Sequence, residues 1–194
     1  VPTYTDAFFE SISGLTTTGA TVMVDLDNQP PGILLWRGIL QWLGGLGIIV
    51  MAVSVLPMLQ IGGMQLFKVE AFETPEKILP RATQISGFIT LIFLNLTGLC
   101  MLAYLFAGMS VLDGIVHAMT TVATGGFSNH DASLGYFNNP AIDMIAILFM
   151  IIGSLPFLLY VQALQGQSKP LFRDGQVRVF LMLLTHLDWI IILQ

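Results

Sequence analysis

Long apolar stretches limit what this sequence can fold into more than any other feature. Three of them have the length of a membrane-crossing helix, about 20 residues: 33–56, 85–108 and 141–164. A fourth begins near Val177. Only 10% of the residues are charged, whereas a soluble domain typically carries about 25%. We therefore expect an all-α membrane protein, surrounded by lipid, with three complete spans and part of a fourth.

The same composition excludes several other classes of protein. A disordered chain needs low hydrophobicity and a disulfide-stapled module needs an even set of cysteines, but Cys100 stands alone. With seven basic residues against twelve acidic ones, the chain lacks the excess of positive charge that binding of nucleic acid requires. No Ser/His/Asp or Cys/His set has a catalytic spacing, so we do not expect an enzyme. The chain opens inside a motif and stops inside an apolar run, which indicates part of a longer protein.

The basic residues predict which loops face the cytoplasm. Six of the seven follow the first and third spans: Lys68, Lys77, Arg81, Lys169, Arg173 and Arg178. Residues 20–32 and 109–140 contain neither Lys nor Arg. By the positive-inside rule, the linkers at 60–80 and 167–176 are cytoplasmic, with an amphipathic surface segment at 65–77, and the other two loops face outside. The seventh, Arg37, is expected to snorkel to the outer surface from the end of its helix.

Prolines and glycines predict where the long helices begin and end. Pro30-Pro31 and Asn138-Asn139-Pro140 are typical of helix starts. Pro57 and Gly62-Gly63 are expected to end the first long helix, and Pro156 is expected to kink the third.

Two further helices are predicted that are too short to cross a bilayer. They cover 3–16 and 110–123, about 13 residues each or roughly 20 Å, so each would be a re-entrant element. Both begin with a capping box, Thr3-x-x-Asp6 and Ser110-x-x-Asp113. An offset of 107 residues superposes the two segments, whereas an offset of 106 breaks both capping boxes. We therefore predict an internal repeat of span, short helix, Thr/Gly turn and span.

Each short helix leads into a run of threonine and glycine, TTTGA at 16–20 and ATGGF at 123–127. Such runs are common in ordinary loops, so one alone predicts little. Two in the same place, at membrane depth, favour backbone that lines a water-filled path and offers carbonyl and hydroxyl oxygens to a monovalent cation. The C-terminal end of the preceding helix would favour that cation, Asp25, Asp27 and Asp131 would attract it, and no basic side chain is expected near either turn.

Several other residues receive mainly structural interpretations. His117 and His130 lack partners at metal-ligand spacing, and His117 is expected to pack behind the second turn. The glycines of the GGLG run at 44–47 resemble a phosphate loop but favour close helix packing. An ion pair between Arg37 and Asp143 is possible. Asp188 lies in an apolar run, where a partner-paired structural role is favoured over a functional one.

Three ordered motifs identify a family resemblance: TDAFFESISGLTTTGAT, QWLGGLGIIVMAVSVLP and LDGIVHAMTTVATGGFS. They resemble the TrkH/KtrB superfamily of potassium transporters, and TrkH-like subunits in particular. That resemblance implies four linked repeats of membrane helix, pore helix and membrane helix around one pore. Here it implies the end of repeat one at 1–59, a cytoplasmic linker at 60–80, repeat two at 81–166, and a cytoplasmic loop with the start of repeat three at 167–194.

The resemblance also implies the ion-binding residues. The first filter strand would be Thr17, Thr18, Gly19 and Ala20, and the second would be Thr124, Gly125, Gly126 and Phe127. Fewer glycines than in the potassium-channel TVGYG pattern imply looser selectivity against sodium.

The implied function is potassium conduction by a multi-pass protein of the cell inner membrane, with the filter loops facing outside. The implied partners are the remaining repeats of the subunit, a second copy of the full-length subunit and a cytosolic nucleotide-binding regulatory ring. An ion-coupled secondary transporter with a half-helix substrate site is the alternative, and a purely structural scaffold is a third possibility.

Overall fold

The computed structural model describes residues 3–59, 75–164 and 174–192. In these ranges the regular elements are all helices and there is no strand, so the predicted all-α class is confirmed there. The chain divides into two units, residues 1–154 and 155–194, which are described separately below. The first unit contains both short helices and both Thr/Gly turns.

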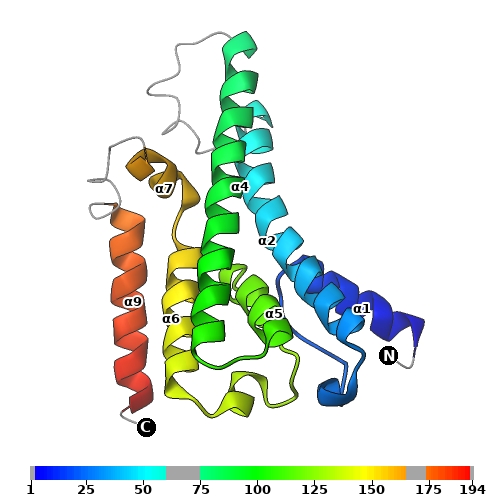
Figure 1. Cartoon of the computed structure of the whole chain (residues 1–194). Coiled ribbons are helices and arrows are strands. Elements are labelled where there is room, and N and C mark those ends of the chain that lie inside the picture. The colour runs from blue at the N-terminus through cyan, green and yellow to red at the C-terminus, as the bar shows by residue number, and fades with distance from the viewer. Residues whose placement is uncertain (1–2, 60–74, 165–173, 193–194) are drawn as a thin grey trace. The chain divides into compact units, whose positions relative to one another are not determined.

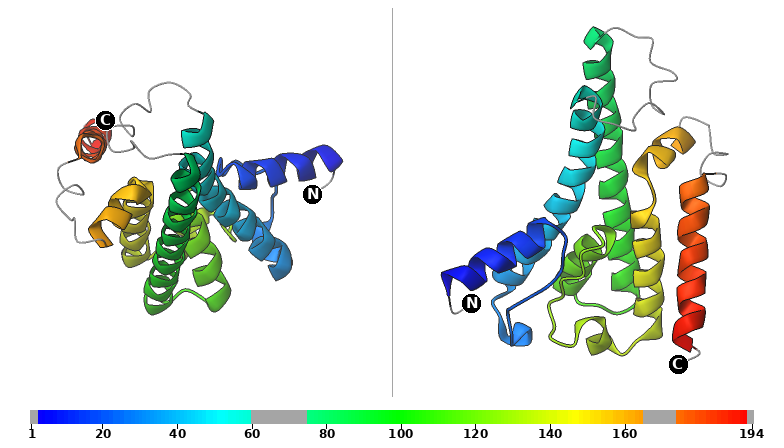
Figure 2. Two further views of the ribbon diagram at one scale, coloured as in Figure 1. Left: turned by 90° about the horizontal axis from the view of Figure 1, so that it is seen from above. Right: turned by 180° about the vertical axis from the view of Figure 1, so that it is seen from behind.

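Two helices of the first unit are long and apolar enough to cross a membrane. α2 (Pro31–Leu59) contains a candidate span at Pro31–Met51, and α4 (Pro75–Phe106) contains one at Gln84–Phe106. They lie side by side in both views from the side (Figure 1, Figure 2). The first two predicted spans therefore have the expected length and composition.

The ends of these helices differ in part from the prediction. α2 begins at Pro31 as expected but continues to Leu59, past Pro57. Proline has a helix-compatible φ and removes only one backbone donor, which a long apolar helix tolerates. Gly62-Gly63, most of the 65–77 segment and most of the 60–80 linker lie outside the described residues, although 75–80 form the start of α4.

The third predicted span is two helices rather than one kinked helix. α6 (Pro140–Ser154) begins at the expected proline, and Asn139 Oδ1 accepts a hydrogen bond from the Ala141 N–H, 3.0 Å away. The helix ends before Leu155-Pro156, because proline disfavours helical backbone in the residue before it. α7 (Phe157–Leu164) follows in the second unit, which also contains α9 (Gly175–Ile192). The Asp188 side chain lies outside the described residues.

The two short helices have the predicted boundaries and caps. α1 (Tyr4–Leu15) and α5 (Val111–Val122) are both 12 residues long, and their first and last residues each differ by 107. The cap hydroxyl accepts a hydrogen bond from a backbone N–H at 3.2 Å in each helix, from Asp6 to Thr3 and from Asp113 to Ser110. Each helix is about 18 Å long and cannot cross a bilayer.

α2 lies between the two short helices and contacts both (Figure 1). α5 also packs against α4 and α6. Two short 3-10 helices, η1 (Leu26–Asn28) and η2 (Ser133–Phe137), belong to the loops that lead from the Thr/Gly turns to α2 and α6. This arrangement places one long helix behind both turns.

Candidate functional site

Both short helices end in the same hydrogen-bonded turn. After α1, the Thr17 N–H donates to Gly14 O and the Thr18 N–H to Ser13 O, both at 3.0 Å. After α5, the corresponding donors Thr124 and Gly125 reach Thr121 O and Thr120 O at 3.0 and 2.8 Å. This pair of bonds is the Schellman motif, in which the first residue after the cap is left-handed and is usually glycine.

Threonine occupies that left-handed position in both turns. Thr17 has φ 55° and Thr124 has φ 53°, values that a residue with a Cβ rarely adopts. Two residues further on, Gly19 and Gly126 have φ 77° and 84°. The two turns therefore share their unusual backbone conformation residue for residue at the offset of 107. Strained positions of this kind persist where surrounding structure holds them, and they cluster at functional sites.

The two turns meet at Gly19 and Gly125. A Cβ built on Gly19 would lie 1.8 Å from the carbonyl oxygen of Gly125, far closer than any real contact. Two independent reasons therefore require glycine at position 19: its positive φ and the close approach of the Gly125 carbonyl. A Cβ on Gly126 would meet no described atom within 4 Å, so only its φ of 84° requires glycine there.

The other predicted site residues are held by their own surroundings. Thr18 Oγ1 lies 2.8 Å from Thr16 Oγ1, and the Ala20 carbonyl accepts a hydrogen bond from the Ser13 hydroxyl. Phe127 is buried, and its N–H donates to Gln41 Oε1 at 3.1 Å. The oxygen of Ala20 is thus turned toward its own helix, unlike the Gly125 oxygen that faces Gly19.

Glycines of α2 and α6 pack against the ends of the short helices. A Cβ on Gly44 would lie 2.0 Å from the Leu15 carbonyl oxygen, and one on Gly45 would lie 3.0 Å from the Ala123 Cβ. In the same way, a Cβ on Gly153 of α6 would lie 2.6 Å from the Val122 carbonyl oxygen. Close helix packing, predicted for the GGLG run, is therefore confirmed at Gly44 and Gly45, but Gly47 has no such neighbour.

Arg37 of α2 does not snorkel to the surface and does not pair with Asp143. It is 3% exposed, and its Nη2 lies 2.8 Å from Oε1 of Glu10 on α1. A buried guanidinium needs a carboxylate and further acceptors, and the nearest carboxylate is supplied by the neighbouring short helix. Glu10, which sequence reasoning missed, is the one charged residue of α1 after its first turn, and that is the signal that could have indicated it.

Arg37 also reaches the end of the second turn. Its Nη1 donates to Ser128 O at 3.0 Å, and its guanidinium lies 4.2 Å from the centre of the Phe127 ring. The expectation that no basic side chain lies near either turn is therefore wrong. The Arg37 side chain thus joins α1, α2 and the end of the second turn. Because Glu10 compensates its positive charge, no unpaired charge is buried next to the turns.

The loops after the two turns are joined by histidine and aspartate. His130 Nδ1 donates to Asp27 Oδ1 at 2.5 Å, and its ring stacks on Tyr136 with centroids 3.6 Å apart. The hydrogen bond from His130 lowers the pKa of Asp27. His130 Nε2 lies 3.3 Å from Asp113 Oδ1, within ion-pair distance but without the alignment of a hydrogen bond. Burial opposes ionisation of Asp113, but hydrogen bonds from Asn129 and Ser110 outweigh it and lower its pKa.

His117 is buried and contacts Ser128, the residue that follows the second turn, rather than the turn that was expected in front of it. Its Nδ1 donates to the Asp113 carbonyl at 2.9 Å, and its Nε2 lies 2.9 Å from the Ser128 hydroxyl oxygen. With Nδ1 as the donor, Nε2 of the neutral imidazole accepts from the Ser128 hydroxyl. Burial lowers the pKa of His117, although the bond to the Asp113 carbonyl opposes the shift.

The three aspartates expected to attract a cation form hydrogen bonds in the loops that follow the two turns. Asp131 accepts a hydrogen bond from the Leu26 N–H at 3.2 Å, and Asp25 accepts one from the Asn28 side chain at 2.6 Å. Their attraction for a cation stays a prediction.

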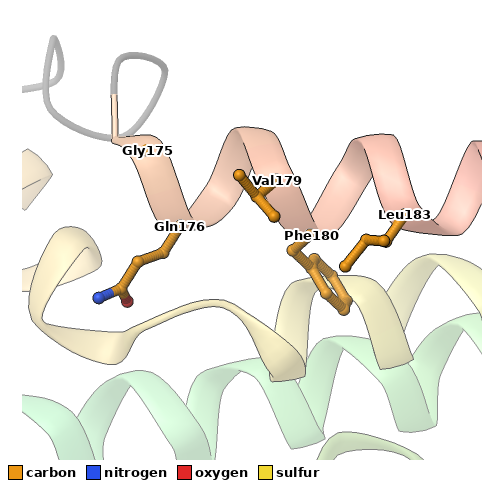
Figure 3. A pocket seen from close by; sticks show the side chains of 5 residues that line it. All are labelled: Gly175, Gln176, Val179, Phe180 and Leu183. Atoms are coloured by element: carbon orange, nitrogen blue, oxygen red, sulfur yellow. The ribbon is translucent and has the colours of Figure 1, made fainter.

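The second unit has a shallow pocket of its own. It runs along α9 and is lined by Gly175, Gln176, Val179, Phe180 and Leu183 (Figure 3). Its lining is almost wholly apolar and brings no set of converging polar groups together, so we assign it no role.

Long apolar helices, with two short capped helices packed against them and ending in matched Thr/Gly turns, define a helical membrane protein. The family model of TrkH, described as cation transport protein, matches residues 1–194. The chain belongs to the TrkH family of cation transport proteins.

Individual relatives agree with this assignment. The potassium uptake protein TrkI of Halomonas elongata is 48% identical over 93% of this chain, and TrkH of Escherichia coli K12 is 49% identical over 92%. The crystal structure of the potassium transporter TrkH from Vibrio parahaemolyticus covers 93% of this chain at 44% identity, with a TM-score of 0.79. The chain spans 37% and 38% of the length of the two curated relatives and 36% of the crystallised chain.

Proposed function

We propose that this chain supplies two of the four filter strands that line a potassium path through a membrane. The strands are the two Thr/Gly turns, Thr17 to Ala20 and Thr124 to Phe127. The ion moves passively down its electrochemical gradient, and the membrane potential contributes about 2.3 kcal/mol per charge per 100 mV. The names of the relatives, which are potassium uptake proteins and transporters, support potassium as the ion.

The approach of Gly19 to Gly125 is the observation on which the proposal rests. The 1.8 Å separation between a Gly19 Cβ and the Gly125 oxygen means that the backbones of the two turns meet at one place. The matched positive φ values at Thr17, Thr124, Gly19 and Gly126 give the turns the same course at that place. Peptide oxygens of two equivalent segments can then replace part of the hydration shell of one cation.

The surroundings of the turns favour a cation. The C-terminal ends of α1 and α5, with their partial negative charge, lead directly into the turns. The nearest described basic side chain, Arg37, is paired with Glu10 at 2.8 Å, so its repulsion is compensated. The Ala20 oxygen accepts a hydrogen bond from Ser13, and the Phe127 N–H donates one to Gln41. We assign these two residues to the outer end of the strands.

We extend the proposal to the setting of the chain in a longer protein. Residues 1–59 and 81–166 belong to two successive repeats of membrane helix, re-entrant pore helix and membrane helix, and 167–194 opens a third. The distribution of basic residues supports turns that open to the outside and linkers at 60–80 and 167–176 in the cytoplasm of an inner membrane. A second subunit and a cytosolic nucleotide-binding ring are assigned as partners on the family resemblance.

Uptake of potassium, rubidium and sodium by the full-length protein in proteoliposomes tests this function. Gly126→Ala adds a Cβ in open space at φ 84°, so it changes the backbone of the turn with little steric clash. We expect it to change the discrimination among the three ions. Gly47→Ala, in the same chain but in a helix and without a close neighbour, is the matched control and should leave discrimination unchanged.

Two results would count against the proposal. Unchanged discrimination in both Gly126→Ala and Gly19→Ala would remove the turns from the ion path. Uptake that requires an imposed pH or sodium gradient would favour an ion-coupled secondary transporter instead.

A further inference from the structure

Gln41 is a polar side chain buried in the middle of a membrane-spanning helix. It is 0% exposed and lies in α2, one helical turn after Arg37 and one turn before Gly45 in the sequence. All three residues contact the second turn or its ends. Arg37 donates to Ser128 O, and Gln41 accepts from the Phe127 N–H. Gly45 packs on Ala123. Gln41 thus sits at the level where the two turns meet.

One end of the Gln41 amide holds the second turn. Its Oε1 accepts a hydrogen bond from the Phe127 N–H at 3.1 Å. Its amide group also occupies the place where a Cβ of Gly125 would be, since such a Cβ would lie 2.3 Å from Gln41 Cδ and 2.4 Å from Oε1. Gly125 has no positive φ, and the corresponding residue of the first turn is Thr18, so the backbone alone does not require glycine at 125. Gln41 is the reason for the extra glycine.

The other end of the amide faces the first turn. Gln41 Nε2 lies 3.6 Å from the Cβ position of Gly19, and it is buried without a hydrogen-bond partner among the described residues. A buried donor of this kind is uncommon in proteins. The amide therefore fills the space between the backbones of the two turns, bonded to one and in contact with the other.

We propose that Gln41 is a positioning residue that sets the separation of the two turns and, through it, the discrimination between potassium and sodium. This inference rests on the proposed function of the turns. Selectivity in a filter made of peptide oxygens depends on how those oxygens are spaced and held. A neutral amide does this without placing a charge of either sign behind the oxygens, which Arg, Lys or Glu at position 41 would do.

The proposal predicts that Gln41 and Gly125 act as a complementary pair. Gln41→Leu keeps much of the volume but loses the bond to the Phe127 N–H, and Gly125→Ala forces the Gln41 amide aside. In the full-length protein, each should lower the potassium-to-sodium uptake ratio by roughly threefold to tenfold, the range for one neutral hydrogen bond. Gln41→Ala combined with Gly125→Ala makes room for the new methyl group, so the double variant should have a higher ratio than Gly125→Ala alone.

Thr97→Val is the control for losing a half-buried hydrogen bond between side chains of α2 and α4. It removes the bond from Trp42 Nε1 to Thr97 Oγ1, 2.9 Å long, which joins α2 to α4 and involves no residue of either turn. We expect a lower melting temperature and an unchanged uptake ratio. A purely structural role of Gln41 would instead lower the melting temperature in Gln41→Leu and leave its uptake ratio equal to that of Thr97→Val.

The outcomes separate this inference from the proposed function. An unchanged ratio in Gln41→Leu, with a changed ratio in Gly126→Ala, would overturn the role of Gln41 and leave the turns as the filter. An unchanged ratio in both would overturn the proposed function as well. If Gln41→Leu does not fold, the comparison of Gly125→Ala with the double variant decides: an equal or lower ratio in the double variant would overturn the pairing.

Discussion

The guanidinium of Arg37 and the carboxylate of Glu10 form a buried ion pair between a long helix and the short helix beside it, with Nη2 and Oε1 2.8 Å apart. Glu10 also accepts hydrogen bonds from the Thr21 hydroxyl and the Val22 N–H, at 2.8 and 3.0 Å. The pair therefore ties α1 and the segment after the first turn to α2. Through Ser128 O it reaches the second turn as well.

Removing one partner of this pair should be far more costly than removing both. Glu10→Ala leaves the Arg37 charge buried and uncompensated, which typically costs about 3–5 kcal/mol. Glu10→Met combined with Arg37→Met should cost much less, because no charge remains buried. Melting temperatures of the full-length protein in detergent measure the difference. Equal losses in the single and double variants would show that the pair does not act as a unit.

Gly44→Ala should destabilise the protein, whereas Gly47→Ala should not. The new Cβ at position 44 would lie 2.0 Å from the Leu15 carbonyl oxygen, so α1 and α2 must move apart, at a cost of about 1–3 kcal/mol. Position 47 has no described neighbour within 4 Å. The same melting measurement compares the two variants, and similar melting temperatures would contradict the close packing of α1 on α2.

Relieving strain in the second turn should increase stability and reduce function. Thr124→Gly removes the cost of a left-handed threonine, about 1 kcal/mol, but also removes a hydroxyl oxygen from the proposed ion path. Ser133→Gly is the control, because Ser133 has the same φ of 53° in the loop that leads to α6. Both variants should melt higher, and only Thr124→Gly should change ion discrimination. If Ser133→Gly also changed ion discrimination, the change in Thr124→Gly could not be attributed to the second turn.

The stability of the fold should fall as the pH drops below about 6.5, because of His117. Burial lowers the pKa of His117 from its usual 6.5, so the unfolded chain binds a proton in a pH window where the folded protein does not. Stability is then lost as the pH falls through that window toward the folded pKa. His117→Asn keeps a donor for the Asp113 carbonyl and should flatten the melting profile in this window. His186→Asn, at an exposed position of α9, is the control, and parallel profiles for His117→Asn and the unmodified protein would contradict the assignment.

Local features of this molecule could be predicted from the sequence. The capping boxes at Thr3 and Ser110, the helix starts at Pro31 and Pro140 and the offset of 107 depend on residues close together in the chain, where cap and proline chemistry is decisive. At Pro156 the sequence predicts only a kink and the helix breaks, because the strength of a proline's effect depends on what surrounds it.

The polar contacts behind the turns could not be predicted. Glu10 and Arg37 are 27 residues apart, and Gln41 and Phe127 are 86 apart, so their pairing depends on the packing of α1, α2 and α5. The sequence predicts that Arg37 snorkels to the surface, with an ion pair to Asp143 as another possibility. The meeting of Gly19 with Gly125 is likewise a product of tertiary structure, although the glycines themselves were identified.

Locating a bound ion tests the central claim most directly. Crystals of the full-length protein grown with rubidium, a heavy substitute for potassium, would show its anomalous scattering. We expect a peak beside the carbonyl oxygens of Gly19 and Gly125, with oxygens of both turns around it. Rubidium bound elsewhere, with no peak between the two turns, would contradict the claim that these segments together line the ion path.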